Sequence, residues 1–445
     1  MSDLLAACEY AVKKALKAGA DEAEVFAGSG RETAVFLQDN DIKIGRTQAS
    51  DQLGIRAFRK TGLGFSSVNS LDRKRIDSAV TAAVALASTA PRDPANRLAD
   101  PLPLHAVKGI YDEAAEGFTT EQALKNASTL LREAKAVDPR ITVDSGQFES
   151  AIGEKAIVTS TGIQASERRS SFDWFVFGMA VDGSEVSAFQ YEFDATHQVD
   201  EVDVAPAARL FAEKAVGSLG TKKCPSFKGT VIFTPGTVQD LLASTVEAAV
   251  DAGSVQRGMS PFAGKLGKPV ASTTLTILDD GTLPGGIGSS TFDREGLPHH
   301  NLPIVEKGVL RSYLYNTYTA NKDKRKSTAS ADGSARSVPA IGPSNFIIPP
   351  GRRPLDDLVA DVKQGLLVTR LSAFPEPVSG NFSGVVKGGA YIEKGEIRHP
   401  VRETMLSGNL YEMLGSVTAL SREQQKIANY FVPHIVLEGG SVTGG

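Results

Sequence analysis

Cysteine is scarce in this chain, because Cys8 and Cys224 are the only two among 445 residues. Two cysteines cannot build the disulfide framework of a small secreted protein, and they are too few for a cysteine-rich zinc site. Cys8 falls on an expected amphipathic helix, where we interpret it as a small core residue. The shortage is typical of a reducing compartment and favours a cytoplasmic location.

Long apolar runs and an excess of one charge are also missing. The first 18 residues are too polar for a signal peptide or a spanning segment, since they contain Asp3, Glu9, Lys13, Lys14 and Lys17. We therefore expect no membrane partner. The 48 Lys and Arg residues face 52 Asp and Glu residues, and the formal net charge of −4 provides no general attraction to nucleic acid.

Paired histidines are absent as well. The six histidines are His105, His197, His299, His300, His399 and His434. No two of them are four or five residues apart, the spacing that brings two imidazoles together on one helix. The chain also has no glycine-rich phosphate loop and no nucleophile elbow, because the glycines around Ser383 have the wrong spacing. The sequence therefore predicts no catalytic residue and no metal ligand.

The patterns that are present predict a two-domain α+β protein with mixed or antiparallel sheets and packed helices. We expect an N-terminal α+β domain over residues 1–220 and a β-rich α+β domain over 221–445, divided at the polar loop 220–228. The first half shows helical periodicity near 2–18, with Ser2 as a possible cap, and over 71–87 and 120–137. Its strand-like runs lie at 24–26, 33–38, 42–44, 54–59 and 62–68, and their short polar turns predict an antiparallel meander.

The second half has shorter elements. It opens with a strand at 230–233 and a single long helix over 238–252. Two segments, 304–310 and 391–397, read as hairpins in which glycine supplies the positive φ of a tight turn. Residues 322–350, rich in Ser, Ala, Lys and Pro, predict a long mobile loop.

Several segments carry a resemblance to a known family. After the helix at 238–252 come Gly253-Ser254-Val255-Gln256-Arg257, Ser260-Pro261-Phe262, Asp279-Asp280-Gly281-Thr282, Phe292-Asp293-Arg294-Glu295-Gly296 and Leu406-Ser407-Gly408-Asn409-Leu410. The chain thereby resembles the TldD/PmbA (TldE) family, in which these segments have the same order. The resemblance is dense over roughly residues 230 to 415 and weaker before them, and it implies the two-domain fold of that family.

The resemblance implies a peptidase complex in which a TldD-like subunit holds zinc with an HExxxH helix and a PmbA/TldE-like subunit lacks that motif. Here the HExxxH position falls near Ala243-Ser244-Thr245-Val246-Glu247-Ala248, and none of these residues replaces an imidazole ligand. The active subunits also use a cysteine near the C-terminus, whereas the last cysteine here is Cys224. The resemblance therefore implies no cofactor in this chain and zinc in an HExxxH-bearing, TldD-like partner.

Four residues are predicted to contact peptide or partner: Arg257, Asp293, Glu295 and Asn409. Arg257 and Asn409 fall where the family builds its central cleft, although turn formation alone would explain Asn409. Asp293 and Glu295 stand close in sequence to His299-His300, the one dense group of metal-ligand residue types. Adjacent histidines point apart in a strand, so we expect a solvated loop there rather than a metal site.

Two further residues have competing interpretations. Glu247 could be a displaced general base, but we interpret it as a plain helix-surface glutamate because it has no metal-binding neighbour in the sequence. His434 lies in an apolar C-terminal strand candidate, where a hydrogen-bonded structural role is expected.

Three functions stay open at this point. The preferred one is a metal-free subunit of a cytosolic TldD/TldE-type metallopeptidase that acts on unfolded or short peptides and forms a chamber with its zinc-bearing partner. The alternatives are a self-contained peptidase with an unusual metal site near His299 and His300, and a peptide-binding regulator without hydrolytic activity. Whether the chain is an enzyme by itself is left undecided.

Overall fold

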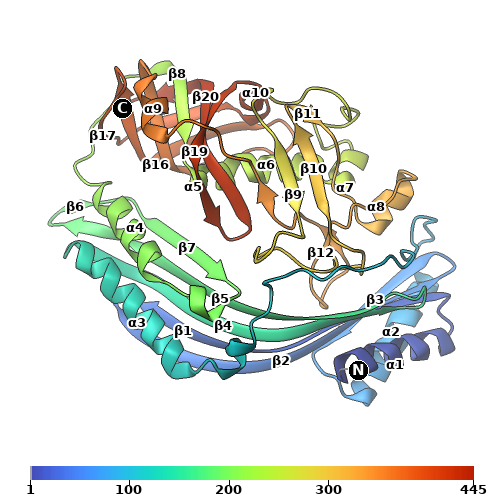
Figure 1. Cartoon of the computed structure of the whole chain (residues 1–445). Helices are drawn as coiled ribbons and strands as arrows, with labels where there is room; N and C mark the ends of the chain where they lie inside the picture. The colour runs from blue at the N-terminus through green and yellow to red at the C-terminus, as the bar shows by residue number, and fades with distance from the viewer. Residues whose placement is uncertain (1–2) are drawn as a thin grey trace.

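The computed structural model describes residues 3–445 and consists of two large sheets, one above the other (Figure 1). The first sheet is long and curved, and its concave face is turned toward the second (Figure 1). This architecture confirms the α+β class. Over the same residues, no helix has both the length and the apolar character needed to cross a membrane.

The N-terminal sheet has the strand order β3-β2-β1-β4-β5-β6, and β7 also pairs with β5. Every pairing in it is antiparallel, and the meander expected for the five runs between 24 and 68 is confirmed as a meander of the three strands β1, β2 and β3. Its members are β1 (Glu22–Gln38), β2 (Asp41–Arg59), β3 (Gly62–Val68), β4 (Ile141–Thr159), β5 (Gln164–Asp182), β6 (Glu185–Val186) and β7 (Gln190–Thr196). The separate strands predicted at 24–26 and 33–38 are wrong, because the polar segment between them stays paired with both β2 and β4.

Four helices pack on this sheet at its two ends. The pair α1 (Asp3–Lys17) and α2 (Arg73–Thr89) forms one core with the sheet, and Cys8 is fully buried in it as predicted. The pair α3 (Thr120–Val137) and α4 (Ala205–Val216) forms the other core, around Phe148, Trp174 and Phe211. The expected cap Ser2 lies outside the described residues. Short 3-10 helices occupy Glu113–Gly117 and Val199–Glu201.

Five strands of the C-terminal half close into a barrel. Neighbours along the ring β20-β18-β16-β15-β8 are hydrogen-bonded, and β8 pairs with β20 to complete it. The strands are β8 (Phe227–Phe233), β15 (Gln364–Ser372), β16 (Asn381–Glu393), β18 (Met405–Asn409) and β20 (Tyr430–Thr443). Two more strands, β17 (Glu396–Pro400) and β19 (Val417–Ile427), pair with β16 and β20. Apolar side chains of all five ring strands belong to one buried core, so the barrel is packed with side chains and is not a pore.

The sheet extends from β20 into a smaller lobe with the order β14-β9-β10-β11. These strands are β9 (Ile277–Asp280), β10 (Asn301–Glu306), β11 (Val309–Leu310) and β14 (Phe346–Ile347). The hairpins predicted at 304–310 and 391–397 are confirmed, and Gly308 and Gly395 have the positive φ expected of their turns. The loop expected at 322–350 contains β12 (Ala331–Asp332), β13 (Ala340–Ile341) and β14, and Ala335 and Phe346 in it are buried.

The single helix predicted over 238–252 is instead a series of turns of different width. It consists of α5 (Pro235–Thr237), a π-helical segment (Val238–Ala243) and α6 (Ser244–Val250), and Asp251 then caps the short α7 (Ala252–Gln256). The remaining helices are α8 (Thr317–Lys322), α9 (Leu355–Ala360) and α10 (Leu410–Gly415). A π-helical turn is rare and often marks a functional position, which directs attention to α6.

The two halves meet where the loop after β12 rests on the N-terminal sheet. A Cβ atom at Gly54 of β2 would lie only 2.1 Å from the backbone oxygen of Ala335, so this close approach requires glycine. Phe26, Ile157 and Phe292 complete a small apolar cluster around Ala335. The junction is therefore a packed interface and fixes the C-terminal half over the concave face.

Candidate functional site

A polar cavity of about 540 Å³ opens beside α6. The helix contributes residues one turn apart, the turn between β19 and β20 contributes Asn429, and β20 contributes its first residue, Tyr430. The loop that carries β12 and β13 provides Asp332 and the segment 341–343. The lining residues are Ser244, Glu247, Ala248, Asp251, Ser254, Leu314, Asp332, Ile341, Gly342, Pro343, Asn429 and Tyr430. Three carboxylates and no Lys, Arg or His line this cavity, so it favours a cationic or proton-donating group.

Glu247 is the most perturbed carboxyl group in this cavity. Its Oε1 atom is buried and, within residues 3–445, has no hydrogen-bond partner. Burial raises the pKa of Glu247 to about 7, and the nearby Tyr430 hydroxyl opposes that rise only in part. The interpretation of Glu247 as a plain helix-surface residue is therefore wrong. It is a half-buried carboxyl group that can hold or release a proton near neutral pH.

The α6 cavity does not fit a zinc ion. Its helical lining consists of Ser244, Glu247, Ala248 and Asp251, so the two imidazoles that would fix the metal are missing. In the described part of the chain, no three His, Cys, Asp or Glu side chains are grouped in a way that could hold a metal. No chemical step is therefore assigned to a metal on this chain.

The residues around His299 do not converge. His299 Nδ1 lies 3.1 Å from Ser344 Oγ, and burial lowers the pKa of His299 to about 4, with the positive charge of Lys155 adding to the effect. His300 is exposed. The solvated loop expected here is wrong for Asp293 and Glu295, which are only 2% and 3% exposed. Glu295 contacts Arg56 across the interface between the two halves, whereas the Asp293 carboxylate accepts hydrogen bonds from the backbone of the C-terminal half.

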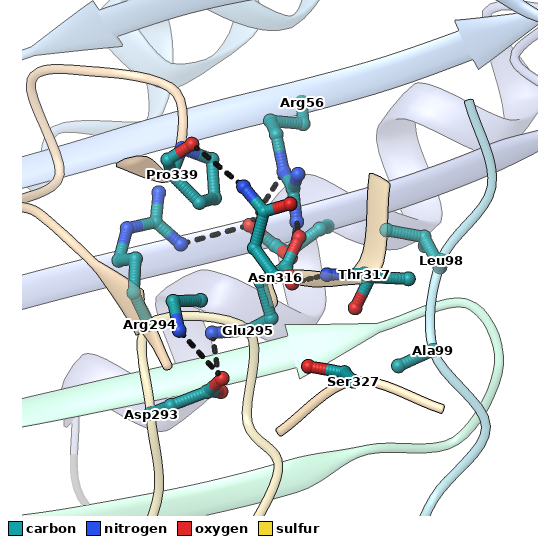
Figure 2. Close-up of polar contacts among 12 residues, drawn as sticks. Arg56, Leu98, Ala99, Asp293, Arg294, Glu295, Asn316, Thr317, Ser327 and Pro339 are labelled. Carbon is teal, nitrogen blue, oxygen red and sulfur yellow. Dashed lines mark hydrogen bonds and ion pairs between the residues drawn. The ribbon is translucent and has the colours of Figure 1, made fainter. Parts of the chain in front are cut away.

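A buried ion-pair network joins these halves, as Figure 2 shows. Arg56 of β2 binds Glu24 of β1 and also reaches Glu295, with 2.9 Å between its Nη2 and Glu295 Oε1. Arg294 Nη1 lies 2.9 Å from Glu24 Oε1, and its guanidinium stacks over the Phe26 ring. Each half thus contributes one arginine and one glutamate to the network, and all four side chains are buried.

The network also organises the C-terminal backbone. Glu295 Oε2 accepts a hydrogen bond of 2.7 Å from the Thr317 N–H at the start of α8. Asp293 accepts from the N–H groups of Glu295, Leu297 and Ala331. Although burial opposes it, Arg56 and Arg294 lower the pKa of Glu24, so that carboxyl group stays ionised. The carboxylate oxygens of Asp293 and Glu295 thus have hydrogen-bond partners within the chain. Their predicted contact with peptide or a partner protein stays a prediction.

Arg257 and Asn409 lie in separate places. Asn409 caps α10, because its Oδ1 accepts from the Tyr411 and Glu412 N–H groups. Arg257 follows α7 and donates to Ser254 Oγ at 3.3 Å, which places it next to the α6 cavity. Their contact with peptide or partner stays a prediction. His434 has the expected structural role, since Nδ1 lies 3.2 Å from Ser421 Oγ.

Fold and site together define a class of protein: a curved antiparallel sheet joined by a buried ion-pair network to a barrel domain with an acidic cavity beside α6, the helix that follows a π-helical turn. Family models support a more specific assignment. The PmbA/TldA metallopeptidase domain 1 matches residues 23–87, the central domain matches 114–219 and the C-terminal domain matches 226–444. The chain belongs to the PmbA/TldD metallopeptidase family.

Individual relatives agree over nearly the whole chain. An uncharacterized protein of Methanocaldococcus jannaschii is 28% identical, with 94% of this chain and 95% of the relative covered. The metalloprotease PmbA homolog of Haemophilus influenzae is 28% identical over 99% and 96%. The metalloprotease TldD homolog of the same organism is 25% identical over 91% and 86%. The crystal structure of TldE from Thermococcus kodakarensis shares the fold, with a TM-score of 0.90, 22% identity and 98% and 100% covered.

Sequence reasoning missed most of this geometry. Tyr430 and Asp332 are far from Glu247 in the sequence, and neither stands in a recognisable motif. The network residues Glu24 and Arg56 were likewise overlooked. One signal was available, because two charged residues in otherwise apolar strand segments suggest a buried pair.

Proposed function

We propose that this chain is the metal-free subunit of a cytoplasmic TldD/TldE-type peptidase complex. Together with a zinc-bearing, TldD-like partner it forms a chamber and a peptide-binding surface for unfolded or short peptides. The observation that carries this proposal is the chemistry of α6. The chain has the domains of a metallopeptidase family, yet its helix presents Ser, Glu, Ala and Asp to the cavity where a metal would need imidazole.

This division of roles leaves definite tasks to the residues of this chain. The ion-pair network and the Gly54 contact hold the barrel over the curved sheet, so the walls of the chamber keep their shape. Glu247, whose pKa lies near 7, supplies a carboxyl group that exchanges a proton at neutral pH. The hydrolytic chemistry belongs to zinc on the other subunit, which activates water in such enzymes.

Coexpression with an HExxxH-bearing paralogue tests the proposal. We expect a stable heteromer in light scattering after size exclusion, and hydrolysis of unfolded peptide by the heteromer that neither chain shows alone. Stoichiometric zinc should appear with the heteromer and be absent from this chain purified by itself. An unassociated and inert mixture would contradict the proposal and favour a peptide-binding regulator.

The self-contained peptidase makes an opposite prediction about metal content. The chain alone would then bind one zinc and lose it when His299 and His300 are both changed to alanine. A His105→Ala variant is the matched control, because it removes an imidazole outside that segment.

A further inference from the structure

A second cavity, of about 670 Å³, lies between the N-terminal sheet and the loop after β12. Strands β1, β2, β4 and β5 form one side of it, and Ser334 and Arg336 border it from the C-terminal half. None of its lining residues belongs to the α6 cavity. Its volume is in the range of ligand pockets, so it can hold part of a small molecule or peptide.

This cavity is basic although the chain as a whole is acidic. Five Lys or Arg side chains and three carboxylates line it, an excess of two positive charges in a protein of net charge −4. Two of the carboxylates already have partners. Glu32 lies 3.2 Å from Arg46, and Glu167 lies 3.3 Å from Lys155. Glu154 is the one carboxylate that remains to balance the other cations.

Three guanidinium groups remain without an ion pair in the described part of the chain: Arg31, Arg169 and Arg336. Arg31 donates to the backbone oxygen of Glu116, and both Arg31 and Arg336 are exposed at the edge of the cavity. Cations that converge on one cavity without counterions repel each other, and an anionic ligand would relieve that repulsion.

Arg169 provides the strongest argument because it is half-buried, unlike Arg31 and Arg336. Its guanidinium is held by the backbone oxygens of Ile287 and Ser289 and lies 3.3 Å from His197 Nε2, so its close partners are neutral. Burial lowers the pKa of Arg169, and the charge of Glu167 opposes this only in part. A cation partly withdrawn from water is normally paired with an anion, and among residues 3–445 no carboxylate forms an ion pair with Arg169.

The strand side of the cavity suits an extended chain. Gly28, Gly30 and Gly153 lie side by side on β1 and β4 and bear no side chains, so a ligand can approach the sheet closely. The guanidinium groups around this strip have the planar shape that binds carboxylate with two parallel hydrogen bonds.

We infer that this cavity binds a carboxylate group of an extended peptide, with the half-buried Arg169 as the inner partner and the exposed Arg31 and Arg336 as the outer ones. That the ligand is a peptide rests on the proposed function. That the bound group is a carboxylate rests on the positive charge of the cavity. A C-terminal carboxylate and an Asp or Glu side chain share that chemistry.

Titration calorimetry on the full chain at low ionic strength tests the inference. The probes are three acetylated octapeptides of Gly, Ser and Ala: a free acid, its C-terminal amide, and an amide with one internal Glu. We expect the free acid or the Glu peptide to bind at least about tenfold more tightly than the plain amide, since a charge-assisted hydrogen bond is worth roughly 1.5–3 kcal/mol. Added salt should reduce the difference.

The double variant Arg31→Gln, Arg336→Gln should reduce this preference, because Arg169 alone then binds the carboxylate, and should leave the melting temperature unchanged, because both exchanged side chains are exposed. An unreduced preference would contradict the role given to the outer arginines. Arg422→Gln is the matched control, since Arg422 is exposed on the C-terminal half and is not among the cavity residues. Equal binding of all three peptides, or no binding, would overturn the inference. Failure to assemble with a zinc-bearing partner would instead count against the proposed function alone.

Discussion

At the scale of single residues, Glu247 shows how strongly the environment changes a side chain's chemistry. Its sequence neighbours suggest a solvent-facing helix position, but the turn at 429–430 and the loop at 341–343 enclose it. Desolvation disfavours the charged carboxylate, which raises the pKa of Glu247 from 4.5 to about 7. A proton that an exposed glutamate would have lost is therefore still bound near neutral pH.

This pKa shift predicts a pH-dependent contribution to stability. Between about pH 4.5 and 7 the folded state binds a proton that the unfolded state has released, so this contribution falls as pH rises through that range. Glu247→Gln has no ionisable group at this position and should remove this contribution. The free energy of unfolding should then fall less between pH 5 and pH 8 in the variant than in the wild type, by on the order of 3 kcal/mol at most. Scanning calorimetry at both pH values checks this. The exposed Glu213→Gln on α4 is the control, and an equal change in both variants would refute the assignment.

At the scale of elements, local capping and distant pairing decide the structure together. Asn409 ends β18 and begins α10, and its Nδ2 also donates to Ser379 O and Asn381 Oδ1. One side chain thus connects a strand, a helix and the preceding loop. These contacts explain Asn409 without a ligand, as turn chemistry alone would suggest.

Asn409→Ala should lower the free energy of unfolding by about 1 kcal/mol, the usual cost of losing an N-cap. Asn409→Asp should cost less, because it retains the acceptor for the Tyr411 and Glu412 N–H groups while losing the Nδ2 donors. Denaturant unfolding of both variants measures the difference. If peptide binding changes while stability does not, Asn409 contacts the ligand after all.

At the scale of the whole molecule, the two halves are joined by charges withdrawn from water. Glu24, Arg56, Arg294 and Glu295 sum to zero charge, so the group is stable only when complete. Arg56 is the central member because it contacts a carboxylate from each half. Loss of one partner leaves a buried charge without compensation.

Arg56→Met should therefore destabilise the protein by about 3–5 kcal/mol. Adding Glu295→Gln should recover part of that loss, because the Arg294–Glu24 pair stays balanced and a glutamine oxygen still accepts from the Thr317 N–H. Thermal unfolding of the single and double variants checks the order. Arg311→Met is the control, because it breaks an exposed ion pair with Glu306 and should cost no more than about 1 kcal/mol. If Arg311→Met destabilised the protein as much as Arg56→Met, the buried network would be excluded as the cause.

The sequence predicted what depends on local pattern. The α+β class, the helices on the first sheet and both glycine hairpins follow from periodicity and turn chemistry. The break after Val250 was missed, because the apolar spacing continues through it while Asp251 turns the backbone to an extended conformation. The cavities were beyond reach, since residues such as Glu247 and Tyr430 meet only through the tertiary fold. The same limit concealed the long-range pairing of Glu24 with Arg294.

The closed ring of strands also sets an order for folding during synthesis. All pairings of the N-terminal sheet lie within residues 22–196, and α4, which completes its second core, ends at Val216, so that half can form before the ring strands have been made. Strand β8 must wait much longer, because its two neighbours are β15 and β20, and the second begins at Tyr430. Both edges of its apolar segment are bare until β15 is made, and one edge stays bare until β20 follows. Bare strand edges are the condition in which nascent chains attract chaperones or aggregate.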